Sequence, residues 1–320
     1  MWIAQSVSLL SACLMLWLCG ALAWANQARV LLVMDPESEI HQAVLDGLRA
    51  NPASIDWRLE IANQHQWLDR QEGRVPGLDD YPLILTIGTR AAQLVLQAAP
   101  AAPVLSVLVP KTTYEQLLGA APAAGQVVER SAIYLDQPPR RQLALARALL
   151  PQARTAGLIV GPGLGAQADG LTAMADTYTL ELRLTELGHE DDPARAIQRM
   201  LPGSDLVLAL YDPVVLKPLT AKWLLYMAYQ RRTPVIAFSQ GYLKAGAVAA
   251  VFSTPQQIGR QAGELLNRWL RDGGDGLGDP RFPQDFEIGF NRAVAESLDL
   301  RFPGVEEARE RMALLLEITP

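Results

Sequence analysis

The chain is poor in the residues that most often carry catalysis or hold metal ions. Its 320 residues include 2 cysteines and 3 histidines, and no G-x-S-x-G nucleophile motif is present. Cys13 and Cys19 both lie near the N-terminus, so a chain that begins after them has no disulfide, thiol nucleophile or cysteine-type zinc site. His41, His65 and His189 lack the spacing of metal ligands. We therefore predict a protein that is not an enzyme and has no metal or cofactor.

The chain is also low in charge. Charged residues make up 19% of the sequence, the net charge is −6, and no basic stripe is present, so a nucleic-acid partner is not indicated. Hydrophobic residues make up 50% of the chain. This length and composition are sufficient for two domains, each with a sizeable core.

The first 25 residues differ from the rest because they carry no charged side chain. They are mostly apolar and end in the small-x-small sequence Ala23-Trp24-Ala25, which is typical of a signal peptidase site. We expect a signal peptide cleaved near Ala25 and a mature protein in the periplasm. Two alternatives stay open. The apolar run is long enough for an uncut membrane anchor, and the residues before Cys13 have the types found in a lipidation box.

From residue 29 onward, apolar segments alternate with amphipathic ones. The segments LIL (83–85) and LVL (206–208) are apolar without alternation, as expected for strands buried on both faces of a parallel sheet covered by helices. The strand–helix series runs once to about residue 136 and then begins again. We predict an α/β fold with two doubly wound parallel-sheet lobes. Residues 305–318 are predicted to form a helix that packs on either lobe.

Small or polar residues follow the predicted strands at the points where helices begin. Ligands of open α/β sheets bind outside the carboxyl ends of the strands. Free N–H groups at a helix start suit a carboxylate or phosphate. Gly88-Thr89 is the clearest case, with Thr89 expected to cap its helix and to offer a hydroxyl to a ligand besides. The alternative is plain helix capping.

Acidic and aromatic residues also occur at strand ends. Asp35, Asp136 and Asp212 would either pair with a ligand ammonium or cap turns. Tyr211, Phe238 and Tyr242 would either stack on an apolar part of a ligand or belong to the core.

The segment GPGLGA (161–166) fits the G-x-G-x-x-A pattern of dinucleotide-binding loops. The alternative is a tight turn at the edge of a cleft. Pro162 is unusual in the dinucleotide pattern, and an exported protein seldom meets free NAD. We therefore favour the turn.

The ordered set of segments resembles one known family, the ABC-transporter substrate-binding proteins of the type I periplasmic-binding fold, in the branch of tryptophan and tyrosine binders. The resemblance covers residues 29–302 and is strongest at 234–266. It is carried by LILTIGTRAAQLV, APVLSVLVP, RQLALARALLPQARTAGLIVGP, SDLVLALYDPVVL, TPVIAFSQGYLKAGAVAAVFSTPQQIGRQAGELL and FEIGFNRAVAESLDL.

The resemblance implies two lobes joined by a three-crossing hinge. The crossings would lie near Asp136, near Phe252-Ser253 and at residues 284–286. The N-terminal lobe would comprise residues 29–134 plus 252–284, the C-terminal lobe 135–251 plus 285–302, and the C-terminal helix 303–320.

Carried over by position, the resemblance also implies a set of ligand-facing residues. Pro110-Lys111-Thr112 stands where the family often has Asp-Pro, and Gly161-Pro162 where it often has Asn-Pro. Both differences change the polarity of the expected pocket. The implied ligand-binding residues are Gly88, Thr89, Pro110, Lys111, Asp136, Gln137, Gly161, Pro162, Tyr211, Asp212, Ser239 and Gln240.

The function implied is that of a monomeric periplasmic solute-binding protein. It would capture a small molecule, an amino acid or similar, between its lobes and deliver it to an ABC permease. One alternative is a ligand-sensing accessory protein of a receptor or outer-membrane uptake system, which neighbouring permease and ATPase genes would argue against. Another is an exported α/β enzyme, which turnover would reveal.

Overall fold

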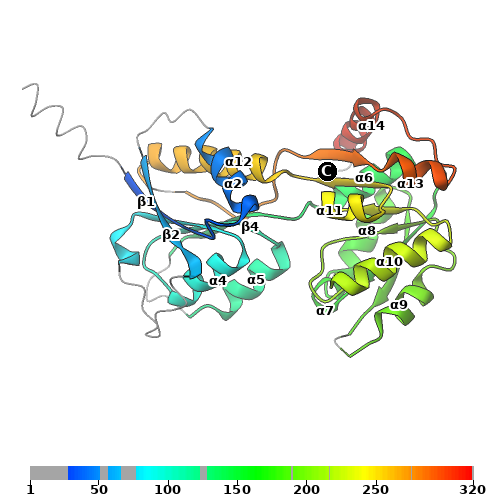
Figure 1. Ribbon diagram of the computed structural model, residues 1–320, viewed down its shortest axis with the longest axis horizontal. Helices are drawn as coiled ribbons and strands as arrows, with labels where there is room; N and C mark the ends of the chain where they lie inside the picture. Colours follow the sequence, from blue (N-terminus) through cyan, green and yellow to red (C-terminus); the bar gives the residue numbers. More distant parts are fainter. Residues whose placement is uncertain are drawn as a thin grey trace, which may run out of the picture.

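The computed structural model shows two lobes side by side along the long axis of the molecule (Figure 1). The predicted signal peptide and His189 lie outside the described part of the chain. Within that part, no helix is both long enough and apolar enough to cross a membrane. The structure describes residues 28–50, 57–65, 77–122, 128–188, 190–215, 217–274 and 276–318.

The N-lobe is built on a five-stranded sheet in the order β2-β1-β3-β4-β5, with all neighbouring strands parallel. β3 and β4 are buried along their whole length, which explains their unbroken apolar sequences. The edge strand β2 is partly exposed. The elements are β1 (Ala28–Met34), α2 (Glu39–Arg49), β2 (Trp57–Asn63), the 3-10 helix η1 (Leu78–Asp80), β3 (Leu83–Ile87), α4 (Thr89–Ala98), β4 (Val104–Val109), α5 (Lys111–Ala120) and β5 (Arg130–Tyr134).

Helix α12 (Pro255–Arg271) returns to the N-lobe from late in the chain and packs against α2 (Figure 1). The two helices touch backbone to backbone, because a Cβ on Gly259 would lie 2.0 Å from the carbonyl oxygen of Val44. Thr254 and Gln257 form a reciprocal capping box at its start. The helix therefore begins at a defined residue directly after the chain leaves the second lobe.

The C-lobe is built on a six-stranded sheet in the order β11-β10-β9-β8-β6-β7. The sheet is parallel as predicted except at β11, which runs antiparallel to β10 because the chain re-enters this lobe from the hinge end. The strands are β6 (Thr155–Val160), β7 (Glu181–Glu186), β8 (Leu206–Leu208), β9 (Val235–Ala237), β10 (Ala249–Phe252) and β11 (Glu287–Phe290). The helices are α6 (Pro139–Leu149), α7 (Pro162–Gly165), α8 (Ala168–Thr177), α9 (Pro193–Met200), α10 (Pro218–Gln230), α11 (Gln240–Ala245), α13 (Arg292–Ser297) and α14 (Val305–Ile318).

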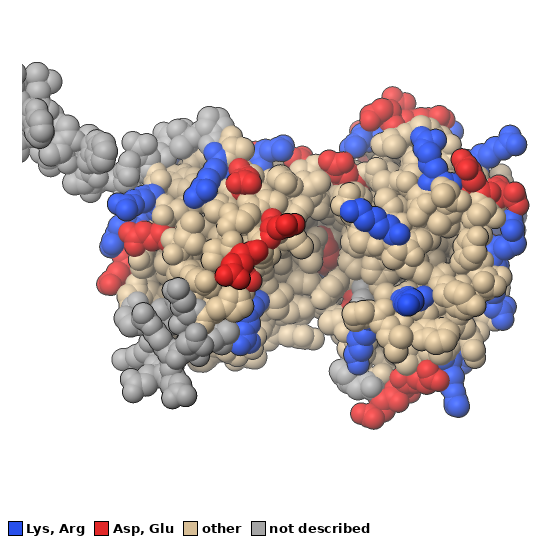
Figure 2. Space-filling view, in the orientation of Figure 1, with Lys and Arg blue, Asp and Glu red and all other residues tan. Residues whose placement is uncertain are grey.

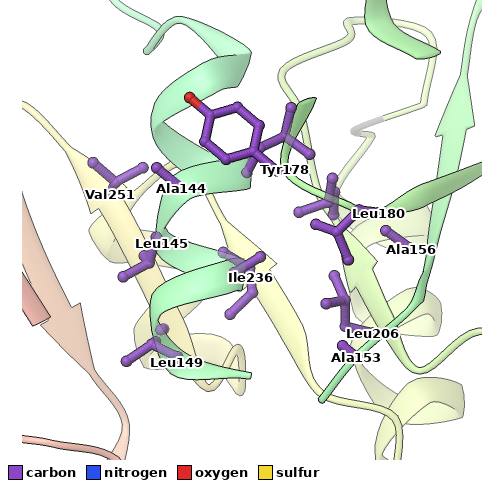
Figure 3. Close-up of a cluster of buried hydrophobic side chains, with 14 of the residues drawn as sticks. Ala144, Leu145, Leu149, Ala153, Ala156, Tyr178, Leu180, Leu206, Ile236 and Val251 are labelled. Atoms are coloured by element: carbon purple, nitrogen blue, oxygen red, sulfur yellow. The ribbon is translucent and has the colours of Figure 1, made fainter. Parts of the chain in front are cut away.

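The larger core of the C-lobe lies between its sheet and α6. Leu145 and Leu149 of α6 lie beside Ile236 and Val251 of the sheet (Figure 3). The C-terminal helix α14 joins this core through Met312, which is fully buried. The sequence left open which lobe this helix covers, and the structure places it against α6 of the C-lobe.

The chain passes from one lobe to the other three times. The first crossing joins β5 to α6, and the second joins β10 to α12. The third runs from Arg281, which bridges to β5, to β11. The prediction of two doubly wound lobes on a three-crossing hinge is confirmed. The residue boundaries that we assign to the lobes stay a prediction.

Candidate functional site

In both lobes the strand order reverses direction between the first and third strands. β1 neighbours β3 in the N-lobe, and β6 neighbours β8 in the C-lobe. The loops that leave such a pair of strands run to opposite faces of the sheet, which opens a crevice at their carboxyl ends. Figure 2 shows the molecular surface hollowed between the two lobes. The candidate site is therefore assembled from the loops on either side of this hollow.

At the carboxyl end of β3, helix α4 begins without a side-chain cap. The N-cap residue is Gly88, at φ 87°, and it has no side chain to accept from the helix. Thr89 is the first helical residue and is exposed, so the expectation that it caps its own helix was wrong. The first N–H groups of α4 are thus free of a cap and suit an anionic or acceptor group of a ligand.

His41 lies beside this helix start and was not predicted as a site residue. The backbone N–H of Asp35 donates to its Nδ1 at 3.1 Å, so the neutral ring carries its proton on Nε2. Nε2 lies against the backbone of Gly88, where a Cβ would come within 2.7 Å of it. Burial lowers the pKa of His41, which keeps the ring neutral. In the sequence, His41 belongs to an ordinary first helical turn and gives no sign of a site. It reaches the site only because β1 and β3 are adjacent in the sheet.

Both carboxylate oxygens of Asp35 interact with other residues of the N-lobe. Its Oδ1 accepts from the backbone N–H of Glu37 at 3.0 Å, and its Oδ2 lies 3.1 Å from Nε2 of His65. The hydrogen bond from His65 lowers the pKa of Asp35. This carboxylate therefore organises the loop after β1.

Asp136 is the carboxylate that faces the cleft at the hinge. It follows β5, and its Oδ1 accepts from the backbone N–H of Lys111 at 2.8 Å. The Lys111 ammonium lies 3.4 Å from Glu115, so this lysine forms its salt bridge with Glu115 and not with Asp136. Burial raises the pKa of Asp136 to about 6. A cation that binds next to a partly desolvated carboxylate stabilises its charged form.

Asp212, by contrast, is buried and holds the C-lobe loops together. Its carboxylate accepts from the backbone N–H groups of Gly161 at 2.8 Å, Val214 at 2.9 Å and Val215 at 3.3 Å. These bonds tie the loop after β6 to the loop after β8. We had expected Asp212 to be either a ligand partner or a turn cap, and its hydrogen bonds are those of a turn cap.

Aromatic side chains line the C-lobe side of the hollow. The rings of Tyr211 and Phe238 meet edge to face with centroids 5.7 Å apart, and Phe238 contacts Tyr242 at 5.2 Å. Burial raises the pKa of Tyr211, so its hydroxyl stays protonated and remains a hydrogen-bond donor. From the third crossing, Phe282 contacts Tyr134 at 5.2 Å. Rings from both lobes therefore reach the hinge end of the cleft.

A cavity of about 50 Å³ lies between the lobes, and Asp136, Tyr211, Phe238 and Phe282 are among the residues that line it. Ligand pockets usually measure roughly 300 Å³ or more, so this cavity becomes large enough only if the lobes rearrange around a ligand. Of the twelve predicted residues, Lys111, Asp136, Gln137 and Tyr211 line it. The prediction omitted other wall residues, including Thr112, Gln142, Leu164 and Phe282.

None of the other predicted residues lines this cavity, and Ser239 lines a separate groove beside α10 and α11. Thr89 is at the start of α4, Pro110 precedes α5, and Pro162 begins the short helix α7. Ser239 caps α11 and accepts from the backbone N–H of Tyr242 at 3.3 Å. The remaining predicted residues are Gly88, Gly161, Asp212 and Gln240.

Gln137 has a second role as the centre of the hinge. Its Nε2 donates to Oγ of Ser253 at 2.8 Å, and that hydroxyl donates to the carbonyl of Asp285 at 2.5 Å. Arg141 donates to Oε1 of Gln137 at 2.6 Å and to the carbonyl of Pro283 at 2.7 Å. One side-chain network therefore joins all three crossings. Burial lowers the pKa of Arg141 to about 10, so it remains charged at neutral pH.

Two doubly wound lobes, three crossings and a polar, aromatic-lined cleft at the strand ends define a type I periplasmic-binding fold. The sequence profile described as "ABC transporter substrate binding protein" matches residues 40–303. The chain belongs to this family, which comprises substrate-binding proteins and not enzymes. The resemblance found in the sequence is thereby confirmed.

Individual relatives are distant. The chain is 24% identical over 230 residues to the tyrosine-binding protein of Clostridioides difficile (strain R20291), across 70% of this chain and 64% of the relative. The chain thus spans less than two thirds of that relative's length.

Solved structures share the fold. The ligand-free, open structure of a substrate-binding protein with adhesive properties from Clostridium difficile has a TM-score of 0.63 at 18% identity, covering 88% of this chain and 97% of that one. An ABC domain in complex with L-Trp from Streptococcus pneumonia has a TM-score of 0.59 at 17% identity, covering 88% and 98%.

Proposed function

We propose that this protein is a non-enzymatic, monomeric solute-binding protein of the periplasm, released by signal-peptide cleavage near Ala25. It captures an amino acid or a similar small molecule between its lobes and delivers it to an ABC importer. The observation that carries the proposal is Asp136, a partly buried carboxylate without a salt bridge in the described chain, set beside aromatic rings in the cleft.

The site favours a ligand with a cationic amine and a planar apolar body. The ammonium would pair with Asp136, and the rings of Tyr211, Phe238 and Phe282 would contact the apolar body. The tyrosine and L-Trp named for two relatives have this chemistry, which supports the proposal.

The start of α4 would bind a different part of the ligand. β3 and β5 are separated by β4, so Thr89 lies about 10 Å from Asp136 by the spacing of strands. The ammonium and carboxylate of a free α-amino acid are too close together to reach both places. The Thr89 hydroxyl, the N–H groups of α4 and His41 Nε2 would instead receive an acceptor group at the far end of the ligand.

Binding would be coupled to closure of the lobes. The residues that line the cavity belong to both lobes, and the hinge offers few crossings to bend. A ligand that touches both lobes binds the closed form better and shifts the population toward it. The importer would then recognise the closed form.

Thermal shift with a panel of amino acids and amines tests the proposal on the chain from residue 26. A ligand at about one hundred times its Kd adds roughly 2.7 kcal/mol to the free energy of unfolding, which raises Tm by several degrees. We expect such a rise for aromatic amino acids or related amines. No shift across the panel, with no small molecule bound in native mass spectrometry, would contradict the proposed function.

A further inference from the structure

Helix α10 exposes more apolar surface than a helix on the outside of a domain usually does. Its inner side is buried through Leu224, Leu225 and Ala228. Its outer side leaves large apolar side chains in solvent: Leu219 is 68% exposed, Trp223 44%, Tyr226 58% and Tyr229 45%. A helix that is apolar all round is normally covered on every side. Its outer face therefore has the character of an interaction surface.

The part of α10 that carries Tyr226 and Tyr229 forms one wall of a groove, and α11 with Val294 of α13 forms the other. The groove has a volume of about 800 Å³. Tyr226 and Tyr229 project from its α10 wall, and the small residues Ala221, Gly241 and Ala245 leave room between the walls. The hydroxyl of Tyr242, also a lining residue, is buried without a hydrogen-bond partner among the described residues. The surface is thus concave and apolar, and it lies outside the proposed ligand cavity.

The charged residues of the two helices that form the walls of this groove are all of one sign. Lys217, Lys222 and Lys244 flank it, and neither α10 nor α11 contains an acidic residue. None of these lysines forms an ion pair with another described residue. Figure 2 shows basic but no acidic side chains over α10 and α11. The groove is therefore complementary to an apolar partner that carries carboxylates.

The charges and the shape distinguish between the possible occupants. A second copy bound through a two-fold axis would bring the three lysines against their own counterparts, with no acid on α10 or α11 to receive them. A flat lipid surface would touch the outward rings but would leave the space between the two helices unfilled. A helix has both the width and the side-chain projection to fill it.

We propose that the α10–α11 groove docks a helical segment of a partner protein, with apolar side chains on one face of that segment and carboxylates on its flanks. The apolar side chains enter between α10 and α11 and contact Tyr226 and Tyr229, and the carboxylates meet Lys222 and Lys244. Docking does not require the small-molecule ligand, because no wall of this groove belongs to the other lobe.

A pair of labelled model helices of about 18 residues tests the proposal by fluorescence anisotropy. Both helices have a leucine face, and their flanks are glutamate in one and lysine in the other. The full chain from residue 26 should bind the glutamate helix at least about tenfold more tightly than the lysine helix. Tyr226→Ala with Tyr229→Ala, and separately Lys222→Glu, should each weaken that binding about tenfold. The control is Leu314→Ala on α14, which is 61% exposed and distant in the chain.

Each other outcome overturns the proposal. Equal binding of both helices, or of neither, removes the charge complementarity on which the choice of partner rests. Binding to vesicles of phosphatidylglycerol, lost in the tyrosine variant, assigns the groove to a lipid surface. A dimer in sedimentation velocity, abolished by the same variant, assigns it to a second copy. Circular dichroism and an unchanged ligand-induced Tm rise show that the variants are folded.

Discussion

Replacing Asp136 with asparagine removes a charge and keeps the shape, and it should raise stability while lowering ligand affinity. Burial raises the pKa of Asp136 from 3.8 to about 6. A tenfold change in the acidity of a carboxyl group on folding corresponds to about 1.4 kcal/mol. The whole change at Asp136 would therefore cost about 3 kcal/mol of folding free energy. Because the side chain is partly exposed, we reduce this cost to about 2 kcal/mol. An asparagine oxygen can still accept from the Lys111 N–H, which now donates at 2.8 Å. Asp136→Asn should therefore add about 2 kcal/mol to the free energy of unfolding of the ligand-free protein at pH 7.5.

The pH dependence of this gain has a definite sign. Because the folded-state pKa lies above the ordinary value, the carboxyl group costs stability in full above pH 6, and the cost disappears as pH falls toward 3.8. The advantage of Asp136→Asn in urea unfolding should shrink to less than about half at pH 4.5. Asp79→Asn is the control, because its carboxylate also accepts a backbone N–H, from Ala101, but is exposed. A variant at Asp136 that is less stable than wild type at pH 7.5 would refute the reasoning.

Affinity should change in the opposite direction. In isothermal titration, Asp136→Asn should weaken binding of the best amine ligand about tenfold or more, since the ammonium loses its charged partner. Wild-type affinity should fall about tenfold from pH 7 to pH 5, because protonation of Asp136 competes with the ligand. The variant should lose this pH dependence.

Three further substitutions, with Gly170→Ala as a control for the first, test separate parts of the structure. Gly259→Ala places a Cβ 2.0 Å from a carbonyl oxygen of α2 and should cost about 2 kcal/mol or more in urea unfolding, whereas Gly170→Ala, with open space, should gain about 0.5 kcal/mol. Ser253→Ala breaks the link between Gln137 and Asp285 and should speed hydrogen exchange in the three crossings more than elsewhere. Thr89→Ala should weaken ligand binding severalfold with Tm unchanged, and equal affinity would remove Thr89 from the site.

The lobes could be predicted from the sequence because their evidence is local. An unbroken apolar run such as residues 83–87 indicates a buried strand without knowledge of its neighbours, and the structure buries every residue of it. The direction of β11 could not be predicted in this way. Its four residues, EIGF, read the same in either direction of pairing, and only the path of the hinge makes the strand antiparallel.

The sequence predicted where the site lies better than it predicted what each residue does there. Asp136 and Asp212 both follow strands and look alike in sequence, yet one faces the cleft and the other accepts three backbone N–H groups. The difference arises from loops distant in the chain. The same holds for His41, which reaches Gly88 only because β1 and β3 are neighbours, and for Phe282, which lies in a crossing without a regular pattern.

A distance measurement across the cleft tests the central claim most directly. Both cysteines lie at positions 13 and 19, so the chain from residue 26 accepts two unique spin labels, at Gln116→Cys on α5 and Gly163→Cys on α7. Both positions are exposed on opposite lobes, and a Cβ at Gly163 meets nothing within 4 Å. Saturation with the amino acid that gives the largest thermal shift should shorten the label distance by several ångströms, through closure of the lobes. Asp136→Asn should abolish the change at the same concentration. An unchanged distance in wild-type protein with the ligand demonstrably bound would contradict capture between the lobes.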